Sequence, residues 1–225
     1  VGGLLHSKGL FLRDQIEKYP DKAGEYRTLA EDAFDAAIDL FKESAEILEE
    51  KAEEDEALLW PAARTRFYEL AANYDKGMIY AEGSAERQGI LKKTSTMCEA
   101  FIWENEDNLF GGYAYMYWGL VHKGLDEPDR AIEYLVTCAD MPLPDLATDG
   151  ARSYNVWSNL FMQAYYKLSE YANELGDRDG TDYRDVAVTQ IERMLERMPD
   201  AWERQFGHLT LLEYARALSG LGRFA

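Results

Sequence analysis

The sequence is poor in cysteine: Cys98 and Cys138 are the only two among 225 residues. A chain of this length can bury a core large enough to fold without disulfide staples. Both cysteines fall in segments with helical patterning, so we expect buried thiols rather than a disulfide. The sequence also lacks an Asn-x-Ser/Thr glycosylation site and a leading Met. The sequence therefore does not determine the cellular compartment. The cytoplasm is favoured, and a periplasmic or exported protein is also compatible with the sequence, because its N-terminus is not the native one.

Positive charge is scarce as well. Lys and Arg number 24 and Asp and Glu number 42, so the net charge is 24 − 42 = −18. Nucleic acids and anionic membranes attract basic surfaces, so this balance argues against both as the main partner. No run approaches the roughly 18 apolar residues that cross a bilayer, and we expect no direct membrane insertion. The charge permits a basic protein or peptide partner, although selection for solubility would give the same composition.

Proline is limited to six residues, which fall where helices would begin or end, and no convincing strand pattern is present. Apolar residues recur instead at intervals of three and four, the spacing of one helix face. Ser84 and Thr181 stand where N-caps belong. The pattern predicts an all-α chain with helices over residues 2–18, 24–53, 58–80, 84–103, 109–124, 127–140, 151–175, 181–197 and 201–221.

Catalytic and metal-binding patterns are missing too. The histidines have no Glu three residues before them, as a bundle di-iron site would require, and they form no zinc-protease motif. Residues 220–225 match a dinucleotide fingerprint in letters only, because they follow a helix rather than a strand. The acidic run EEKAEEDE at 49–56 is typical of a solvated helix end and linker. We therefore expect no catalytic residue, no metal and no cofactor.

A repeated pattern is the strongest positive signal. In GGYAYMYWGL (111–120), Tyr115 and Trp118 precede the small residue Gly119, and Ala131 and Pro142 follow at the places of a second helix. The pattern of an aromatic, a large apolar and a small residue recurs in YKLSEYANELGD and in LLEYARALSGLGRFA. A small residue at such a place lets two helices approach closely where they cross. The segment 111–123 is thus predicted to be helical although its small and aromatic residues alternate.

This pattern resembles the tetratricopeptide repeat, strongly over 112–225 and loosely over 1–110, where the helices are longer than the roughly 34-residue unit allows. The resemblance implies an α-solenoid of antiparallel helix pairs. It divides one continuous domain into an irregular part, 1–110, and a repeat part, 111–225, whose last repeat is incomplete. In that family one face of each first helix lines a concave groove. The positions that correspond here are Tyr113, Met116, Tyr117, Leu120, Lys123, Gln163, Tyr166, Glu170 and Asn173.

Two functions follow as hypotheses. The first is a non-catalytic interaction scaffold that binds a peptide, a protein or a second copy of itself through the concave face. The alternative is an all-α enzyme or small-molecule receptor with a pocket where the irregular half meets the repeats. Tyr68, Tyr74, Trp103 and Glu104 are the candidates to line that pocket.

The last helix carries apolar residues on more than one side, among them Leu211, Leu212, Tyr214 and Leu218. Ends of helical arrays normally need a polar capping face. We therefore expect either further repeats in a longer protein or a homo-oligomer in which a second copy covers this helix.

Overall fold

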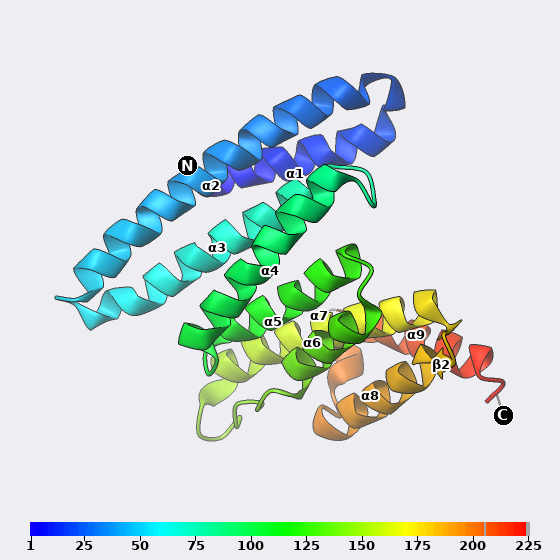
Figure 1. The fold of residues 1–225 in the computed structure, drawn as a ribbon. Coiled ribbons are helices and arrows are strands. Elements are labelled where there is room, and N and C mark those ends of the chain that lie inside the picture. Colours follow the sequence, from blue (N-terminus) through cyan, green and yellow to red (C-terminus); the bar gives the residue numbers. More distant parts are fainter. Residues whose placement is uncertain (205, 224–225) are drawn as a thin grey trace. The chain divides into compact units, whose positions relative to one another are not determined.

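The computed structural model describes residues 1–204 and 206–223, and this part of the chain is almost entirely helical (Figure 1). Short 3-10 turns at Pro20–Lys22, Glu56–Leu58 and Ala201–Glu203 precede α2, α3 and α9. The nine α-helices of the described residues are α1 (Gly2–Lys18), α2 (Ala23–Ala52), α3 (Leu59–Gly77), α4 (Ala85–Asn105), α5 (Leu109–Gly124), α6 (Pro128–Asp140), α7 (Gly150–Leu175), α8 (Tyr183–Arg197) and α9 (Gly207–Gly220). The predicted all-α class is confirmed, and most helix ends fall within two residues of the predicted ones.

The helices form two compact units, Val1–Asp126 with α1 to α5 and Glu127–Ala225 with α6 to α9. We call them unit 1 and unit 2. Within each unit the helices pack mostly against their neighbours in the chain, and no solenoid is detected in the described part of the protein. The division predicted at 110/111 falls at the start of α5, inside unit 1.

Side-chain caps explain where α4 and α5 of unit 1 begin. Ser84 accepts a hydrogen bond from the amide of Arg87 and caps α4, as predicted. Asn108 accepts from the amides of Phe110 and Gly111 and caps α5. At Gly111 a Cβ atom would collide with the carbonyl oxygen of Asn105, so only glycine permits this tight α4–α5 turn. The segment 111–123 is helical, as predicted, and Gly111 serves the tight α4–α5 turn rather than a strand.

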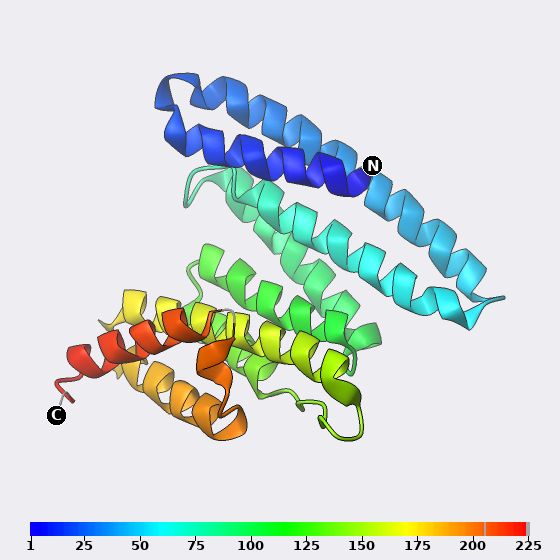
Figure 2. The ribbon, with the colours of Figure 1, turned by 180° about the vertical axis from the view of Figure 1, so that it is seen from behind.

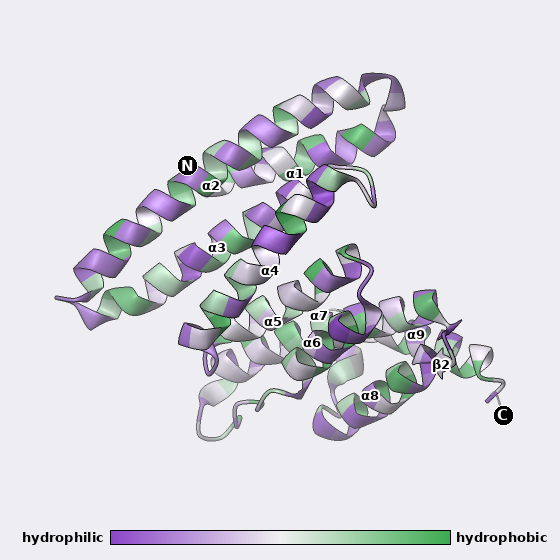
Figure 3. Ribbon diagram, in the orientation of Figure 1, coloured by the Kyte–Doolittle hydropathy of each residue, from purple (hydrophilic) through white to green (hydrophobic). Residues whose placement is uncertain are grey.

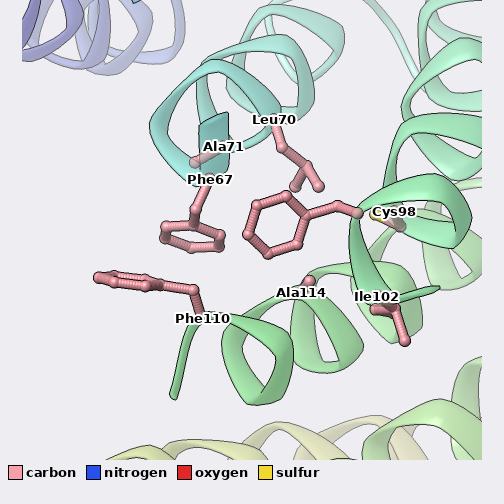
Figure 4. Packing of buried hydrophobic residues seen from close by; sticks show 8 residues of the cluster. Phe67, Leu70, Ala71, Cys98, Ile102, Phe110 and Ala114 are labelled. Carbon is pink, nitrogen blue, oxygen red and sulfur yellow. The ribbon is translucent and has the colours of Figure 1, made fainter. Parts of the chain in front are cut away.

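Unit 1 has a core of stacked aromatic rings between α3, α4 and α5. The rings of Phe67 and Phe110 are 5.9 Å apart and close to parallel, and Phe101 lies 6.5 Å from Phe67. Figure 4 shows the Phe67 and Phe110 rings one above the other, with Leu70 and Cys98 in the same cluster. Figure 2 shows α1 and α2 side by side. Between these two helices, Gly9 of α1 leaves room for the ring of Phe34 of α2.

Unit 2 buries large side chains along α7, including Phe161, Tyr165 and Leu168. Arg197, at the end of α8, closes this core by donating to the backbone oxygens of Ala139 and Met141, the latter at 2.6 Å. The guanidinium also lies over the Phe161 ring at 5.4 Å. Carbonyl groups at the end of α6 that the helix itself leaves unpaired are thus satisfied by α8.

Three predictions about unit 2 were wrong: the absence of strands, the cap at Thr181 and the start of the last helix at 201. A minimal hairpin pairs β1 (Asp177–Arg178) with β2 (Thr181–Asp182), because Asp179 and Gly180 both take positive φ angles, which a tight two-residue hairpin turn requires. Thr181 therefore lies in a strand, and Asp182 is the residue that caps α8. In addition, α9 begins at Gly207 rather than at 201, because Phe206 has a left-handed backbone with φ of 70°.

Polar and apolar residues alternate around the helices in Figure 3, as expected for helices with one buried side. No helix of the described residues is both long enough and apolar enough to cross a membrane. Cys98 and Cys138 are buried thiols, as predicted, and burial raises the pKa of the Cys98 thiol far above its usual value.

Candidate binding groove in unit 1

Unit 1 contains a cavity of about 720 Å³ that is open to solvent between the end of α2, the first half of α3 and the second half of α4. We call it the groove. The residues that line it are Glu49, Leu59, Trp60, Ala62, Ala63, Arg66, Glu69, Leu70, Met97, Ala100, Phe101, Glu104, Asn105 and Asn108.

The floor of the groove is apolar and preformed. Ala62, Leu70 and Phe101 are buried, and Leu70 and Phe101 belong to the aromatic cluster that joins α3, α4 and α5 (Figure 4). Close packing holds such residues in single rotamers, so the floor keeps its shape without a ligand. A partner that binds here therefore meets a fixed apolar surface.

The mouth of the groove exposes two large apolar side chains at the start of α3. Leu59 is 58% exposed and Trp60 is 52% exposed. The indole of Trp60 is nevertheless held in place, because the Phe110 ring lies 5.0 Å away and the Arg64 guanidinium 5.2 Å away. An oriented, half-exposed tryptophan next to an apolar floor is the kind of residue that dominates protein interfaces.

One wall of the groove carries an ion-pair network around Arg66. Its Nε and Nη2 atoms donate to the two carboxylate oxygens of Glu49, each at 2.7 Å, and its Nη1 atom donates to Glu69 at 2.9 Å. These acceptors, Glu49 first, hold the pKa of the Arg66 guanidinium above its usual value. Because the carboxylates of Glu49 and Glu69 already bind Arg66, its positive charge is neutralised. Arg66 therefore does not make the groove a binding site for an anion.

Glu104 lies on the wall formed by α4 and is exposed. No described residue forms a hydrogen bond or ion pair with its carboxylate. The charged groups in the groove are thus Glu49, Glu69 and Glu104 against Arg66, a balance of 1 − 3 = −2. The groove therefore favours positively charged ligands.

The two amides in the lining are structural. Asn108 donates to Asn105 at 2.8 Å and caps α5, while Asn105 donates to the Phe101 carbonyl at 3.0 Å. Their hydrogen bonds hold the α4–α5 turn at one end of the groove. The lining contains no Ser, Thr, Cys, His, Lys or Tyr, so its only nucleophilic groups are carboxylates.

The residues of the predicted concave face that belong to α5 lie elsewhere in unit 1. The rings of Tyr113 and Tyr117 each lie 5.5 Å from the Phe67 ring, and Tyr117 also lies 5.3 Å from Tyr74. Met116 is buried. Burial raises the pKa of the Tyr117 phenol above its usual value. Tyr113 and Tyr117 are partly buried against the aromatic cluster of unit 1, and Leu120 and Lys123 are half-buried as well.

The residues of the predicted face that belong to α7 lie in unit 2, and most pair with neighbours there. Tyr166 stacks on Phe206 at 5.7 Å and donates to Glu170 at 2.8 Å. Asn173 donates to Glu213 of α9 at 2.9 Å. Gln163 donates to a backbone carbonyl of its own helix. Glu170 and Asn173 also line a polar recess of about 450 Å³.

The predicted pocket residues are only partly brought together. Glu104 lines the groove, whereas Tyr68 packs against Phe41 at 5.6 Å and Tyr74 packs against Tyr117. Trp103 is 90% exposed and is not among the lining residues. The residues that sequence reasoning missed are Trp60, Arg66 and Glu49. The i,i+3 spacing of Arg66 and Glu69 is a readable signal, but the contact of Arg66 with Glu49 inside the acidic run is not.

No group of three or more potential metal ligands is found among the described residues. Comparison with known proteins adds no assignment, because no family model, curated protein or solved structure matches the chain.

Proposed function

We propose that this chain is a non-catalytic binding protein, and that the groove of unit 1 takes up a protein or peptide partner with an apolar anchor beside positive charge. The observation that carries the proposal is the pair of half-exposed side chains, Leu59 and Trp60, above a buried apolar floor. Fully burying a Leu-sized side chain is worth roughly 1.5–3 kcal/mol, and about half of the surface of Leu59 and Trp60 is still exposed, so covering both contributes roughly half of this value for each side chain. The uncompensated carboxylate of Glu104 and the net charge of −18 add a preference for basic partners.

The proposal is tested by filling the groove. Peptides are first selected from a random display library on the whole chain, and their Kd values are then measured with Ala100→Arg. Ala100 is exposed on α4 and lines the groove, so arginine there obstructs it without replacing a core residue. The matched control is Ala85→Arg, an exposed position of α4 outside the lining.

We expect Ala100→Arg to raise the Kd at least about tenfold and Ala85→Arg to change it by less than about twofold, with both variants unfolding like the parent. Equal affinities for the two variants, or no selected peptide at all, would remove the groove as the binding site.

A second candidate function is a small-molecule receptor, favoured by the cavity volume of about 720 Å³. Small-molecule sites commonly measure about 300–1,000 Å³. A thermal stability screen against apolar amines separates this candidate, because a bound ligand adds RT ln(1 + [L]/Kd) to the free energy of unfolding and so raises the melting temperature as its concentration exceeds its Kd.

The tetratricopeptide resemblance of 112–225 and the concave face on α5 and α7 stay predictions, as does a homo-oligomer through α9. The pairing of α7 with α8, and of both with α9, is compatible with the repeat pattern. The internal contacts of Tyr117 and Tyr166 favour the groove over that face as the first surface to test.

A further inference from the structure

Resting on the proposed function, we propose that the occupant of the groove is an amphipathic α-helix of a partner protein that carries a basic residue beside its apolar side. The proposed function leaves open the conformation of the partner and the place in the groove that its positive charge meets. It is carried by the shape of the walls, the backbone chemistry of the groove and the position of Glu104.

The walls are faces of two helices. On α3 the lining residues recur as Ala62, Arg66 and Glu69, and on α4 as Met97, Ala100 and Glu104, which is the spacing of a single helix face. Each stripe covers seven to eight residues, or about 11–12 Å of helix at 1.5 Å per residue. The groove is thus long enough for about two turns of a helix laid against α3 and α4.

Small side chains keep the groove open. Ala62, Ala63 and Ala100 stand where larger residues would close the space between the two walls. Helices pack with their axes about 8–10 Å apart, and short side chains at the contact allow the closer of these distances. Leu59 and Trp60 then remain as the exposed apolar groups against which a third helix can pack.

Backbone chemistry favours a helix over an extended peptide. Both walls are α-helices whose backbone groups bond within the helix, so the groove offers no strand edge to an extended chain. An extended peptide would bring unpaired amide and carbonyl groups against the apolar floor, which is costly. A helix satisfies its own backbone and presents only side chains.

The charged residues of the groove favour a partner helix with positive charge. Arg66 is already held by Glu49 and Glu69, whereas the carboxylate of Glu104 has no partner among the described residues. A lysine or arginine on the incoming helix, near its apolar side, would pair with Glu104. An acidic helix would meet uncompensated negative charge instead.

The test uses the whole chain and three fluorescein-labelled synthetic peptides of the same length and apolar residues. The first is a helix-forming peptide with lysines beside its apolar side, the second replaces these lysines with glutamate, and the third is the basic peptide with a central proline that breaks the helix. Each is titrated against the parent chain, Glu104→Lys and the matched control Glu99→Lys. Glu99 is exposed on the same helix but lies outside the groove.

We expect the basic helical peptide to bind most tightly, and its Kd to rise about three- to tenfold with Glu104→Lys but less than about twofold with Glu99→Lys. The proline peptide should bind at least about tenfold more weakly. Added salt should reduce the difference between the basic and acidic peptides.

Tighter binding of the acidic peptide, or equal binding of the proline peptide, would overturn this inference while leaving the groove as a binding site. Failure of all three peptides, together with library peptides that are indifferent to Ala100→Arg, would instead remove the proposed function.

Discussion

The groove of unit 1 and the polar recess of unit 2 are both concave, but they differ in what they offer a ligand. The recess presents polar groups that already form hydrogen bonds with one another, and the groove presents exposed apolar side chains. The recess is lined by Glu170, Asn173, Glu174, Arg184, Glu213, Arg216 and Gly220. In it the buried Glu213 accepts from Arg216 at 2.6 Å and from Asn173 at 2.9 Å, and Arg184 is bound by Asp182 at 2.6 Å. A ligand entering the recess would compete with these hydrogen bonds. The groove instead leaves apolar surface exposed.

This difference shows why volume alone does not identify a site. A typical hydrogen bond contributes a net of about 0.5–1.5 kcal/mol to stability, or about 1.5–3 kcal/mol when one partner is charged, and a buried group left unpaired costs about 1–3 kcal/mol. Covering Leu59 and Trp60 removes apolar surface from water without displacing any hydrogen bond of the described residues. A partner that covers the groove of unit 1 therefore gains binding free energy from apolar burial. Substitutions at matched positions in the two units can test this difference.

The largest effects are expected from the two phenylalanines at the centres of the cores. Phe67→Ala in unit 1 and Phe161→Ala in unit 2 should each lower the free energy of unfolding by about 3–5 kcal/mol, because a large cavity replaces a buried ring. Urea denaturation measures the loss, and hydrogen exchange with mass spectrometry locates it. We expect Phe67→Ala to reduce protection mainly in 1–126 and Phe161→Ala mainly in 127–225. Equal loss in both regions for either variant would contradict the division into two units.

A smaller difference in the free energy of unfolding is expected between variants of two aspartates that form ion pairs with arginine side chains. Asp75 in unit 1 is buried and accepts from His6 and Arg13 of α1, each at 2.8 Å. Asp140 in unit 2 pairs with Arg193 and is exposed. We expect Asp75→Asn to lower the free energy of unfolding by about 2–4 kcal/mol and Asp140→Asn by less than about 1 kcal/mol.

The measurement is chemical denaturation of both variants at one pH. His6→Gln serves as a further control, because it keeps a hydrogen-bond donor toward Asp75 and should cost less than Asp75→Asn. Similar losses for Asp75→Asn and Asp140→Asn would show that the α1–α3 contact contributes little.

Much of the fold could be predicted from the sequence because helix signals are local. The caps, the scarce prolines and the spacing of apolar residues placed every helix. The hairpin at 177–182 was missed because two-residue strands carry no alternation, although Asp179-Gly180 is a known hairpin turn pair. Because the hairpin was missed, Thr181 was expected to cap α8. The hairpin backbone, rather than the residue type, makes Asp182 the N-cap of α8.

The site was less predictable because it depends on contacts between distant residues. The tyrosines of α5 read as an interface composition, yet Phe67, far earlier in the chain, packs against Tyr113 and Tyr117. Likewise Glu49 belongs to a run of acids that is typical of solvated surface, and only the pairing of α2 with α3 brings it to Arg66. Periodicity shows which side of a helix is apolar, but the neighbour that covers this side is set by tertiary packing.

A third prediction contrasts two tyrosines whose pKa values are both raised to about 12, for different reasons. In Tyr74 of unit 1 the first cause is burial, and the charge of Asp75 comes second. In Tyr166 of unit 2 the first cause is the hydrogen bond to Glu170. We expect Glu170→Gln to lower the pKa of Tyr166 toward 10, and Asp75→Asn to leave most of the Tyr74 shift in place.

These shifts have a consequence for stability at alkaline pH. An unfolded tyrosine loses its proton near pH 10, whereas these phenols keep theirs to about pH 12. Between these values the folded state binds more protons than the unfolded state, so the free energy of unfolding falls as pH rises from about 10 to 12 and is unaffected by these groups below pH 10. Absorbance at 295 nm and carbon-13 NMR of the tyrosine ring follow the ionisation. Ionisation of Tyr74 near pH 10 in the folded chain would contradict the prediction.

The smallest effects on stability are expected from two exposed leucines, Leu59 in the groove and Leu212 on α9, which is 50% exposed. Leu59→Gln and Leu212→Gln should each change the free energy of unfolding by no more than about 0.5 kcal/mol, because neither side chain fills a core. Glutamine removes apolar surface without adding charge, so the change tests the apolar contact alone.

The effects of the two variants on binding should differ. Leu59→Gln should raise the Kd of the basic helical peptide, since part of the apolar mouth is lost, whereas Leu212→Gln should leave this Kd unchanged. If α9 does join two copies of the chain, sedimentation velocity should show the opposite order: Leu212→Gln lowers the association constant and Leu59→Gln does not. Loss of peptide binding in Leu212→Gln with no effect of Leu59→Gln would move the binding surface from unit 1 to unit 2.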